Sequence, residues 1–390
     1  MTAGTETSFE YIDTEKALRS VAARIKNAAH VAVDTEANSL HRYFERVCLI
    51  QLTIDGEHFI VDPLVDLDYD RFMRVLGGKK LFLHGADYDL RMLRASFDFS
   101  PRGGVFDTMV AAQLLGYEQF GLAALASHFC DVTLSKDGQK SDWTQRPLSA
   151  SQLRYASDDT RYLETIADGL KKELESLGRL AWHDEACARV VEASASTSTR
   201  DPDDEWRIRG LGKLKRREVA LARELWYWRD KESQCADRPP FKVLGNRQLI
   251  ELAIWAVVHP RQGLDHGPSL PRNCTGRRFK ALERAVQRGR GLSESQWPEV
   301  RRHKQPGPYE PECRELTDAL RTASAKVAEG LKIEPAVLGS KAAMATVARN
   351  RPESVEEMVA CGPIMKWQAE LLAPVAREVY AKFDGRSGQD

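Results

Sequence analysis

The sequence lacks the features of exported, membrane-spanning and zinc-binding proteins. Its seven cysteines form no Cys-x-x-Cys pair, and an odd number of cysteines in a 390-residue chain favours reduced thiols over disulfides. No apolar run approaches the ~18 residues that a transmembrane helix requires. The first residues are polar and acidic rather than basic and apolar, unlike a signal peptide. These absences predict a cytoplasmic protein that makes no membrane contact.

The chain also lacks net charge, with 57 Lys and Arg against 57 Asp and Glu. The charges are nevertheless unevenly distributed. Residues 1–190 hold 22 basic and 29 acidic side chains, whereas residues 211–290 hold 18 basic and 8 acidic ones. A basic segment supplies sequence-independent attraction to a phosphate backbone, but an acidic segment needs metal ions before it can accept phosphate. The distribution is consistent with a protein that performs its chemistry in the acidic segment and attracts a phosphate backbone through the basic one.

Four acids and one phenol stand out in the first 160 residues. Asp34 and Glu36 end an apolar strand, and they face the same side because strand side chains alternate. Asp89 falls in the first turn of a helix expected from about residue 87, where the helix dipole favours an anion. Tyr155 and Asp159 are four residues apart and share one face of a helix that begins near residue 152.

Carboxylates that converge on one point repel each other unless cations neutralise them. Four acids therefore predict an oxygen-ligand cage for hard divalent metals bound with a phosphate substrate. Each acid alone has an ordinary structural interpretation, as a turn former, a helix-terminal charge or an exposed helical residue. Their joint order and spacing favour metal-assisted phosphodiester cleavage.

With flanking segments at residues 106–112, 121–125 and 139–149, these motifs resemble ribonuclease D, a member of the DEDD superfamily of 3′→5′ exonucleases, in its tyrosine subgroup. The resemblance covers almost the whole chain. It implies one catalytic set, made of Asp34, Glu36, Asp89, Tyr155 and Asp159.

The resemblance also implies roles for these residues around two Mg²⁺ or Mn²⁺ ions. Asp34 would be shared between the ions, Glu36 and Asp159 would complete the site of the water-activating ion, and Asp89 would serve the second. Tyr155 would orient the attacking water, since a phenol with a pKa near 10 suits hydrogen bonding better than proton abstraction.

The implied activity is metal-dependent 3′→5′ exoribonuclease cleavage that releases nucleoside 5′-monophosphates. The implied partner is RNA with a free 3′ end, such as a transfer RNA precursor, bound by a monomer. Two alternatives stay open: a DNA exonuclease, because the same acids serve such enzymes, and a non-catalytic RNA-binding scaffold, against which the intact set of five residues argues.

Further side chains are candidates for substrate contact through charge or stacking. His84 and Trp143 have competing structural interpretations, as a satisfied strand-end histidine and as a core residue. Asp107 is predicted to cap a helix rather than to join the site. The full set of substrate-binding candidates is His84, Lys140, Trp143, Arg146, Arg277, Arg278 and Lys280.

The predicted fold is an α/β ribonuclease H-like exonuclease domain followed by two all-α domains. Its five-stranded mixed sheet is expected from strands at Ala29–Asp34, Val47–Ile54, His58–Asp62, Leu81–His84 and Val105–Phe106.

The expected domain boundaries follow composition and motif. Residues 1–190 form the exonuclease domain, and 191–210 form a small, polar, proline-containing linker. Residues 211–294 resemble the helical HRDC module, and 295–390 form a second, divergent copy. Because all five catalytic residues precede Arg200, a chain that ends there is expected to hydrolyse short single strands.

Overall fold

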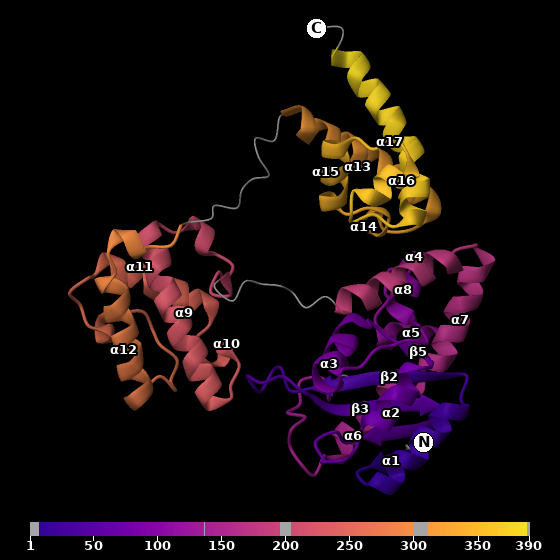
Figure 1. The fold of residues 1–390 in the computed structure, drawn as a ribbon, viewed down its shortest axis with the longest axis horizontal. Helices are drawn as coiled ribbons and strands as arrows, with labels where there is room; N and C mark the ends of the chain where they lie inside the picture. Colours follow the sequence, from indigo (N-terminus) through magenta and orange to yellow (C-terminus); the bar gives the residue numbers. More distant parts are fainter. Residues whose placement is uncertain (1–7, 136, 196–203, 300–310, 388–390) are drawn as a thin grey trace. The chain divides into compact units, whose positions relative to one another are not determined.

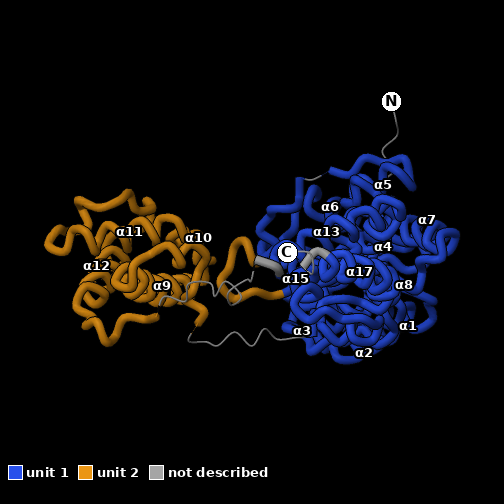
Figure 2. The backbone as a smooth tube through the Cα atoms, turned by 90° about the horizontal axis from the view of Figure 1, so that it is seen from above, with its two compact units in different colours: residues 1–37, 47–196, 309–390 blue, residues 38–46, 197–308 orange. Residues whose placement is uncertain are grey.

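The computed structural model describes residues 8–135, 137–195, 204–299 and 311–387 (Figure 1). The chain divides into two compact units (Figure 2). Unit 1 comprises residues 1–37, 47–196 and 309–390, and unit 2 comprises the remainder, 38–46 and 197–308. Among the helices of the described segments, none has both the length and the apolar character needed to cross a bilayer.

A six-stranded mixed sheet is the centre of unit 1. Its spatial order is β1-β4-β3-β2-β5-β6, with β2 antiparallel to β3, β3 antiparallel to β4, and the other neighbours parallel. The strands are β1 (Glu10–Ile12), β2 (His30–Ala37), β3 (Val47–Ile54), β4 (Glu57–Val61), β5 (Lys80–Leu83) and β6 (Val105–Asp107).

The prediction of a mixed sheet is confirmed, and the prediction of five strands is wrong by one. Five of the strands lie where the sequence placed them, within three residues at each end. The additional strand is β1, which holds only three residues and pairs in parallel with β4 at the sheet edge.

Helices cover both faces of the sheet. On one face, alternate residues of β2 such as Val31 and Val33 pack against the apolar stripes of α1 (Glu15–Asn27), α2 (Asp70–Gly77) and α3 (Asp87–Phe97). On the other face, Ala32 and Phe82 join the core formed with the helices that follow β6. These are α4 (Thr108–Leu115), α5 (Leu122–Cys130) and α7 (Leu163–Ser176). The other described helices of this region are α6 (Ala150–Arg161) and α8 (Leu180–Ala195).

Residues 311–387 form a helical bundle that belongs to unit 1. Its apolar side chains, among them Ile333 and Trp367, join the same hydrophobic cluster as Leu114 and Leu125 of the exonuclease domain. We call this part the C-terminal bundle. It consists of α13 (Pro311–Leu331), α14 (Pro335–Leu338), α15 (Lys341–Asn350), α16 (Val355–Ala360) and α17 (Lys366–Ser387).

Polar contacts fix the C-terminal bundle on α8 and its neighbours. The Glu185 carboxylate accepts hydrogen bonds from the backbone N–H groups of Lys366 and Trp367, at 2.6 and 3.2 Å, so it binds the positive end of α17. Arg179 is 7% exposed and donates one hydrogen bond to the Leu114 carbonyl and another to the Leu331 carbonyl, each at 2.7 Å.

Apolar stacking and a close backbone approach complete this contact. The Trp182 and Trp367 rings stack with centroids 4.6 Å apart. Gly116 has a φ of 84°, and a Cβ there would lie 1.8 Å from the Lys332 carbonyl oxygen. A side chain at Gly116 would therefore force the C-terminal bundle away from α4.

Unit 2 is built around a long helix, α9 (Arg216–Ala236), which packs against α11 (Asn246–Val258) and α12 (Gly276–Gly291). The short helix α10 (Pro240–Val243) connects α9 to α11. Arg229 of α9 is 4% exposed and donates to the Leu244 carbonyl and to the Asn246 side chain. Burial lowers the pKa of Arg229 to about 10.

Unit 2 and the C-terminal bundle share one succession of helices. Both α9 and α13 hold 21 residues, both α10 and α14 hold four residues and begin with proline, and both short helices are followed after two residues by the next helix. The matched spacing supports the predicted internal repeat. The descent of the second copy from an HRDC module stays a prediction.

Candidate active site

Strand β2 carries the first two acids to the middle of the sheet. Asp34 pairs in register with Gln51 of β3, and Glu36 pairs with Leu49. The register shifts directly after Glu36, so regular pairing ends there. The two carboxylates therefore share one face of a central strand, as the alternation of side chains predicts.

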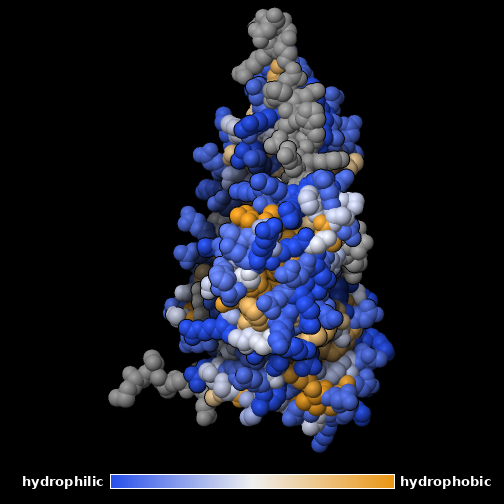
Figure 3. Space-filling model, turned by 90° about the vertical axis from the view of Figure 1, so that its left-hand side faces the viewer, coloured by the Kyte–Doolittle hydropathy of each residue, from blue (hydrophilic) through white to orange (hydrophobic). Residues whose placement is uncertain are grey.

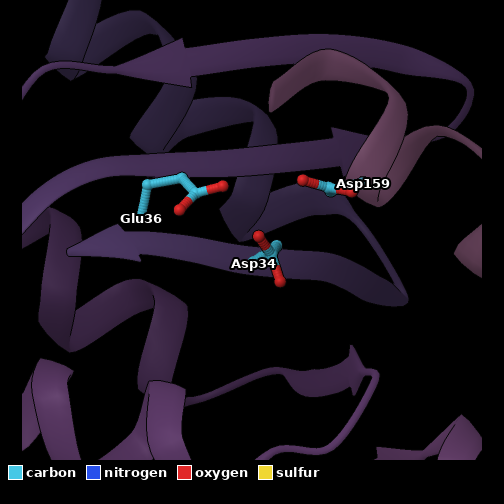
Figure 4. Close-up of side chains that lie close together, drawn as sticks. All are labelled: Asp34, Glu36 and Asp159. Carbon is cyan, nitrogen blue, oxygen red and sulfur yellow. The ribbon is translucent and has the colours of Figure 1, made fainter. Parts of the chain in front are cut away.

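Helix α6 brings the third acid to this face. Its start is fixed by Ser149, whose hydroxyl accepts from the Gln152 N–H at 3.2 Å while the Gln152 side chain accepts from the Ser149 N–H at 3.0 Å. The carboxylates of Asp34, Glu36 and Asp159 point toward one another (Figure 4). One oxygen from each lies within 4.8 Å of the others.

Asp89 is fixed to the same strand through Thr35. Its Oδ1 accepts from the Thr35 hydroxyl at 2.6 Å and from the Thr35 N–H at 3.1 Å. The side chain is 6% exposed, in the first turn of α3. Thr35 lies between Asp34 and Glu36, so it couples the fourth acid to the first two. Sequence analysis gave Thr35 no role, although its hydroxyl beside two acids was the available signal.

The four acids are electrostatically strained in the absence of cations. Burial, and then repulsion from the other acids, raise the pKa of Glu36 to about 9 and hold the pKa of Asp34 well above its ordinary range. Burial and the neighbouring carboxylates Asp158 and Asp89 raise the pKa of Asp159 to about 8. Burial also raises the pKa of Asp89 to about 6, against the lowering effect of its hydrogen bonds from Thr35.

This donor set fits divalent cations. Carboxylate oxygens are the ligands that Mg²⁺ and Mn²⁺ prefer, and bound cations would relieve the repulsion that raises these pKa values. Ligands must be deprotonated before they bind a metal, so loading such a site releases protons. Apolar side chains at these positions would avoid the repulsion, so the presence of four converging acids points to a metal-binding function.

Tyr155 stands beside the acids with its ring held by packing. Burial, followed by the charges of Asp159, Glu36 and Asp34, raises the pKa of its phenol. The phenol therefore stays protonated at neutral pH and can donate a hydrogen bond. Among the described residues, none accepts from or donates to its hydroxyl.

Gly138 holds the Tyr155 ring from one side. A Cβ at Gly138 would lie 2.3 Å from the Tyr155 Cγ, so only glycine fits this approach. Sequence analysis missed this residue, because a glycine in a turn has many ordinary explanations. The Trp143 ring lies near the same phenol, with centroids 6.0 Å apart.

Two of the predicted substrate contacts have structural positions instead. Trp143 is 1% exposed, so its face is unavailable for stacking on a base, and we assign it to the core. Arg146 forms a two-pronged ion pair with Asp62, at 2.6 and 2.7 Å, and donates to the Trp143, Gln145 and Cys48 carbonyls. These five hydrogen bonds match the five N–H groups of a guanidinium, which leaves none for RNA.

Other candidates near the site are more varied. His84 is partly buried with Nδ1 2.9 Å from the Thr108 hydroxyl, and burial lowers its pKa. Lys140 is exposed. The predicted helix cap is confirmed at Asp107, which accepts from the Met109 N–H at 2.9 Å.

The three basic candidates of unit 2 also differ in position. Arg277 is exposed and lines a groove between α9 and α12. Arg278 is partly buried and pairs with Glu232 at 3.4 Å. Lys280 is exposed on α12.

Comparison with known proteins agrees with both parts of the fold. Residues 9–175 match the 3′-5′ exonuclease family model, and residues 218–254 match the HRDC domain model. A ribonuclease D of Jannaschia sp. is 31% identical over 328 residues, covering 81% of this chain and 83% of the relative. A ribonuclease D of Pseudomonas paraeruginosa is 28% identical over 349 residues, covering 86% and 88%.

Solved structures show the same fold. Escherichia coli RNase D, described as an exoribonuclease involved in structured RNA processing, superposes with a TM-score of 0.72 at 23% identity, over 96% of this chain and 99% of that one. The catalytic core of RRP6 from Trypanosoma brucei gives a TM-score of 0.58 at 26% identity, over 72% and 79%. With these relatives and this acidic site, the chain belongs to the ribonuclease D family and is a 3′→5′ exoribonuclease.

Proposed function

We propose that Asp34, Glu36, Asp89 and Asp159 hold two divalent ions, Mg²⁺ or Mn²⁺, at which RNA is shortened from its 3′ end. The observation that carries this proposal is the meeting of three carboxylate oxygens within 4.8 Å in a partly buried setting. When bound, a pair of such ions activates water and stabilises the leaving oxygen of a phosphodiester.

The protein's own residues divide the remaining work. Asp34 would contribute to holding both ions, and Glu36 and Asp159 would hold the ion nearer Tyr155. One carboxylate oxygen of Asp89 accepts hydrogen bonds from Thr35, and the other oxygen would be available to the second ion. Tyr155 donates its hydroxyl proton in a hydrogen bond that orients the attacking water. Its raised pKa excludes it as a base at neutral pH.

The substrate class we propose is transfer RNA precursors in the cytoplasm, bound by the protein as a monomer, with nucleoside 5′-monophosphates as products. His84 and Lys140 are proposed contacts near the acids, and Arg277 and Lys280 are proposed contacts in unit 2, with Arg278 contributing through its partly exposed edge. The excess of basic residues in 211–290 supports backbone binding there.

A cleavage assay tests this function. The purified protein is incubated with a 5′-labelled transfer RNA precursor and with DNA of the same sequence, in EDTA and with each metal. We expect a ladder shortened from the 3′ end on RNA, in Mg²⁺ or Mn²⁺ only. Faster shortening of DNA would assign the site to DNA, and cleavage that persists in EDTA would remove metals from the mechanism.

The role of Tyr155 can be separated from ligation. Tyr155→Phe keeps the ring but removes the hydroxyl, so turnover should fall by about 10²-fold, the scale of a positioned proton donor. Gly138→Ala keeps the hydroxyl but displaces the ring, and it should show the same pattern. Calorimetric Mn²⁺ affinity should stay near the wild-type value in both variants, and a collapse of that affinity would make Tyr155 a support of the acids instead.

A further inference from the structure

A groove runs along unit 2 between α9 and α12. Among the residues that line it, only Arg277 has a role in the function proposed above. Its volume is about 460 Å³, within the ~300–1,000 Å³ range of small-ligand sites. Its lining combines cations with aromatic and small side chains. The lining residues are Tyr227, Trp228, Lys231, Glu232, Arg277, Ala281, Arg284 and Arg288.

Helical spacing places these groups in two facing rows. On α12 the lining residues recur at intervals of four, three and four, which is one continuous stripe of a helix. On α9, Tyr227 and Lys231 are four residues apart and form the opposite row. Ala281 is the one small side chain among the lining residues. The short side chain of Ala281 leaves room between the α12 row, which holds three arginines, and the α9 row, which holds Tyr227 and Lys231.

The groove keeps an excess of positive charge after its ion pairs are counted. Glu232, the only acid in the lining, pairs with Arg278, which lies outside the lining, at 3.4 Å. Arg288 pairs with Glu224 at 3.3 Å.

The other three cations, Lys231, Arg277 and Arg284, are exposed, and among the described residues no carboxylate lies within ion-pairing distance of them. Three exposed cations in two rows form an electrostatic site for a polyanion.

An exposed aromatic ring stands among these cations. Tyr227 is 42% exposed, which is unusual for a large ring on a packed helix. The neighbouring Trp226 ring meets it edge to face, with centroids 5.5 Å apart and an interplanar angle of 81°, and this contact orients the phenol. Cations that follow a backbone, together with a ring on which a base can stack, are the combination that binds single-stranded nucleic acid.

The charge of the lining favours nucleic acid over an apolar partner. Figure 3 shows one face of the molecule, which is mainly hydrophilic with separate apolar patches. Three unpaired cations beside one ring are poorly suited to an apolar protein surface, because each would have to be desolvated without a partner.

We propose that the groove between α9 and α12 binds a single-stranded segment of the RNA substrate, with its phosphates on Lys231, Arg277 and Arg284 and one base stacked on Tyr227. The proposal rests on the exoribonuclease function and assigns a binding site to a unit that holds none of the four acids.

Binding to the full-length protein in EDTA tests this proposal without any contribution from metal or hydrolysis. The probe is a fluorescent 20-nucleotide RNA without self-complementarity, followed by anisotropy over a range of salt concentrations. The double substitution Lys231→Ser with Arg284→Ser should weaken binding at least tenfold at low salt. It should also reduce the slope of log K against log salt by about 1.4, which is about 0.7 for each lost contact with a single strand.

Three further variants test the stacked ring and the space in the groove separately from charge. Tyr227→Ala should weaken binding at least fivefold, whereas Tyr227→Phe, which keeps the ring, should bind like wild type. Ala281→Leu leaves the charge unchanged but fills the space between the rows, and it should weaken binding to a similar degree. The matched control is Arg261→Ser with Arg272→Ser, which removes two exposed charges outside the groove and should cause a smaller loss.

Each outcome either supports or overturns the proposal that the groove binds single-stranded RNA. Wild-type affinity in both Tyr227→Ala and Ala281→Leu would overturn it, and so would an equal loss in the control pair. A loss in the charge variants alone would indicate backbone contact without a stacked base, as a duplex stem would make, and would also contradict the proposal. Because the measurement is made without metal, failure here leaves the metal site untouched, and failure of the metal site leaves this binding intact.

Discussion

Asp34→Asn should reduce turnover on a short single-stranded RNA by about a thousandfold or more, which corresponds to about 4 kcal/mol of barrier. The substitution keeps the shape of the side chain but removes the negative charge that two cations would share. An Asp34 carboxylate oxygen lies within 4.8 Å of oxygens of Glu36 and Asp159, and Asp34 also feels the charge of Asp89, so its loss should affect both proposed ion positions. Single-turnover rates with saturating Mg²⁺ or Mn²⁺ give the measurement.

Asp34→Asn should leave the protein folded, so a loss of turnover can be distinguished from a loss of structure. The pKa of Asp34 is raised in the folded protein by burial and by the other acids. A raised carboxyl pKa means that the folded state binds protons more tightly than the unfolded state, so the charged form costs stability once the pH rises above the unfolded pKa near 4. In EDTA at neutral pH, Asp34→Asn should therefore melt at the wild-type temperature or above it.

The control for Asp34 is Asp158, which adjoins the third acid but pairs with Arg161 at 3.5 Å. Asp158→Asn should keep turnover within a few-fold of wild type. Added metal should raise the melting temperature of wild type and of Asp158→Asn, and should have much less effect on Asp34→Asn. If Asp34→Asn retained more than about a tenth of wild-type turnover, a loss below ~1.4 kcal/mol, Asp34 would have no place in the mechanism.

The acidic site was predictable from the sequence because its parts are local. Asp34 and Glu36 share a strand face through alternation alone, and Tyr155 and Asp159 share a helix face through their spacing. That these faces meet was an inference from the resemblance, since contacts between distant segments leave no local pattern. Thr35 had a local signal in its position between two acids, but its partner and the partner of Gly138 lie 54 and 17 residues away in the chain, so neither contact could be derived from spacing.

Aromatic and cationic residues near the site were harder to interpret than the acids. Trp143 and Arg146 follow a polar segment that is equally compatible with a substrate surface and with a packed loop. The structure gives Arg146 a buried partner in Asp62, and such a partner cannot be found from spacing when 84 residues separate the two. Charge content therefore predicted the basic character of unit 2 correctly but could not tell paired cations such as Arg278 from unpaired ones such as Arg277.

The structure bears most directly on the expectation that the exonuclease domain can function without the rest of the chain. The acids, Tyr155 and all six strands precede Arg200, which favours a self-sufficient first domain. The C-terminal bundle, however, completes the hydrophobic cluster of α4, α5 and α7, so a chain ending near Arg200 would expose the apolar side chains that now pack against it. The negative net charge of residues 291–390 agrees with a bracing role rather than a phosphate-binding one.

A chain that ends at residue 308 should consequently lose stability in its exonuclease domain while keeping unit 2. It loses the stacking of Trp182 on Trp367 and leaves Arg179 without its Leu331 acceptor. Loss of several kcal/mol, at about 2–4 °C per kcal/mol for a domain of this size, should lower the melting temperature by about 10 °C or more. The shortened chain should also lose its turnover on short RNA at a lower temperature than the full-length protein does, although it keeps all four acids.

A point variant tests the same contact without removing any chain. Glu185→Gln weakens the acceptor for the two N–H groups at the start of α17 and removes the charge that the helix dipole favours, at a cost of about 1 kcal/mol. Its melting temperature should fall by about 2–4 °C. Asp184→Asn alters the adjacent side chain, which is 59% exposed and lies 3.9 Å from Lys80, and it should change the melting temperature by less than about 1 °C. Wild-type melting in both the shortened chain and Glu185→Gln would show that the exonuclease domain needs no support from the C-terminal bundle.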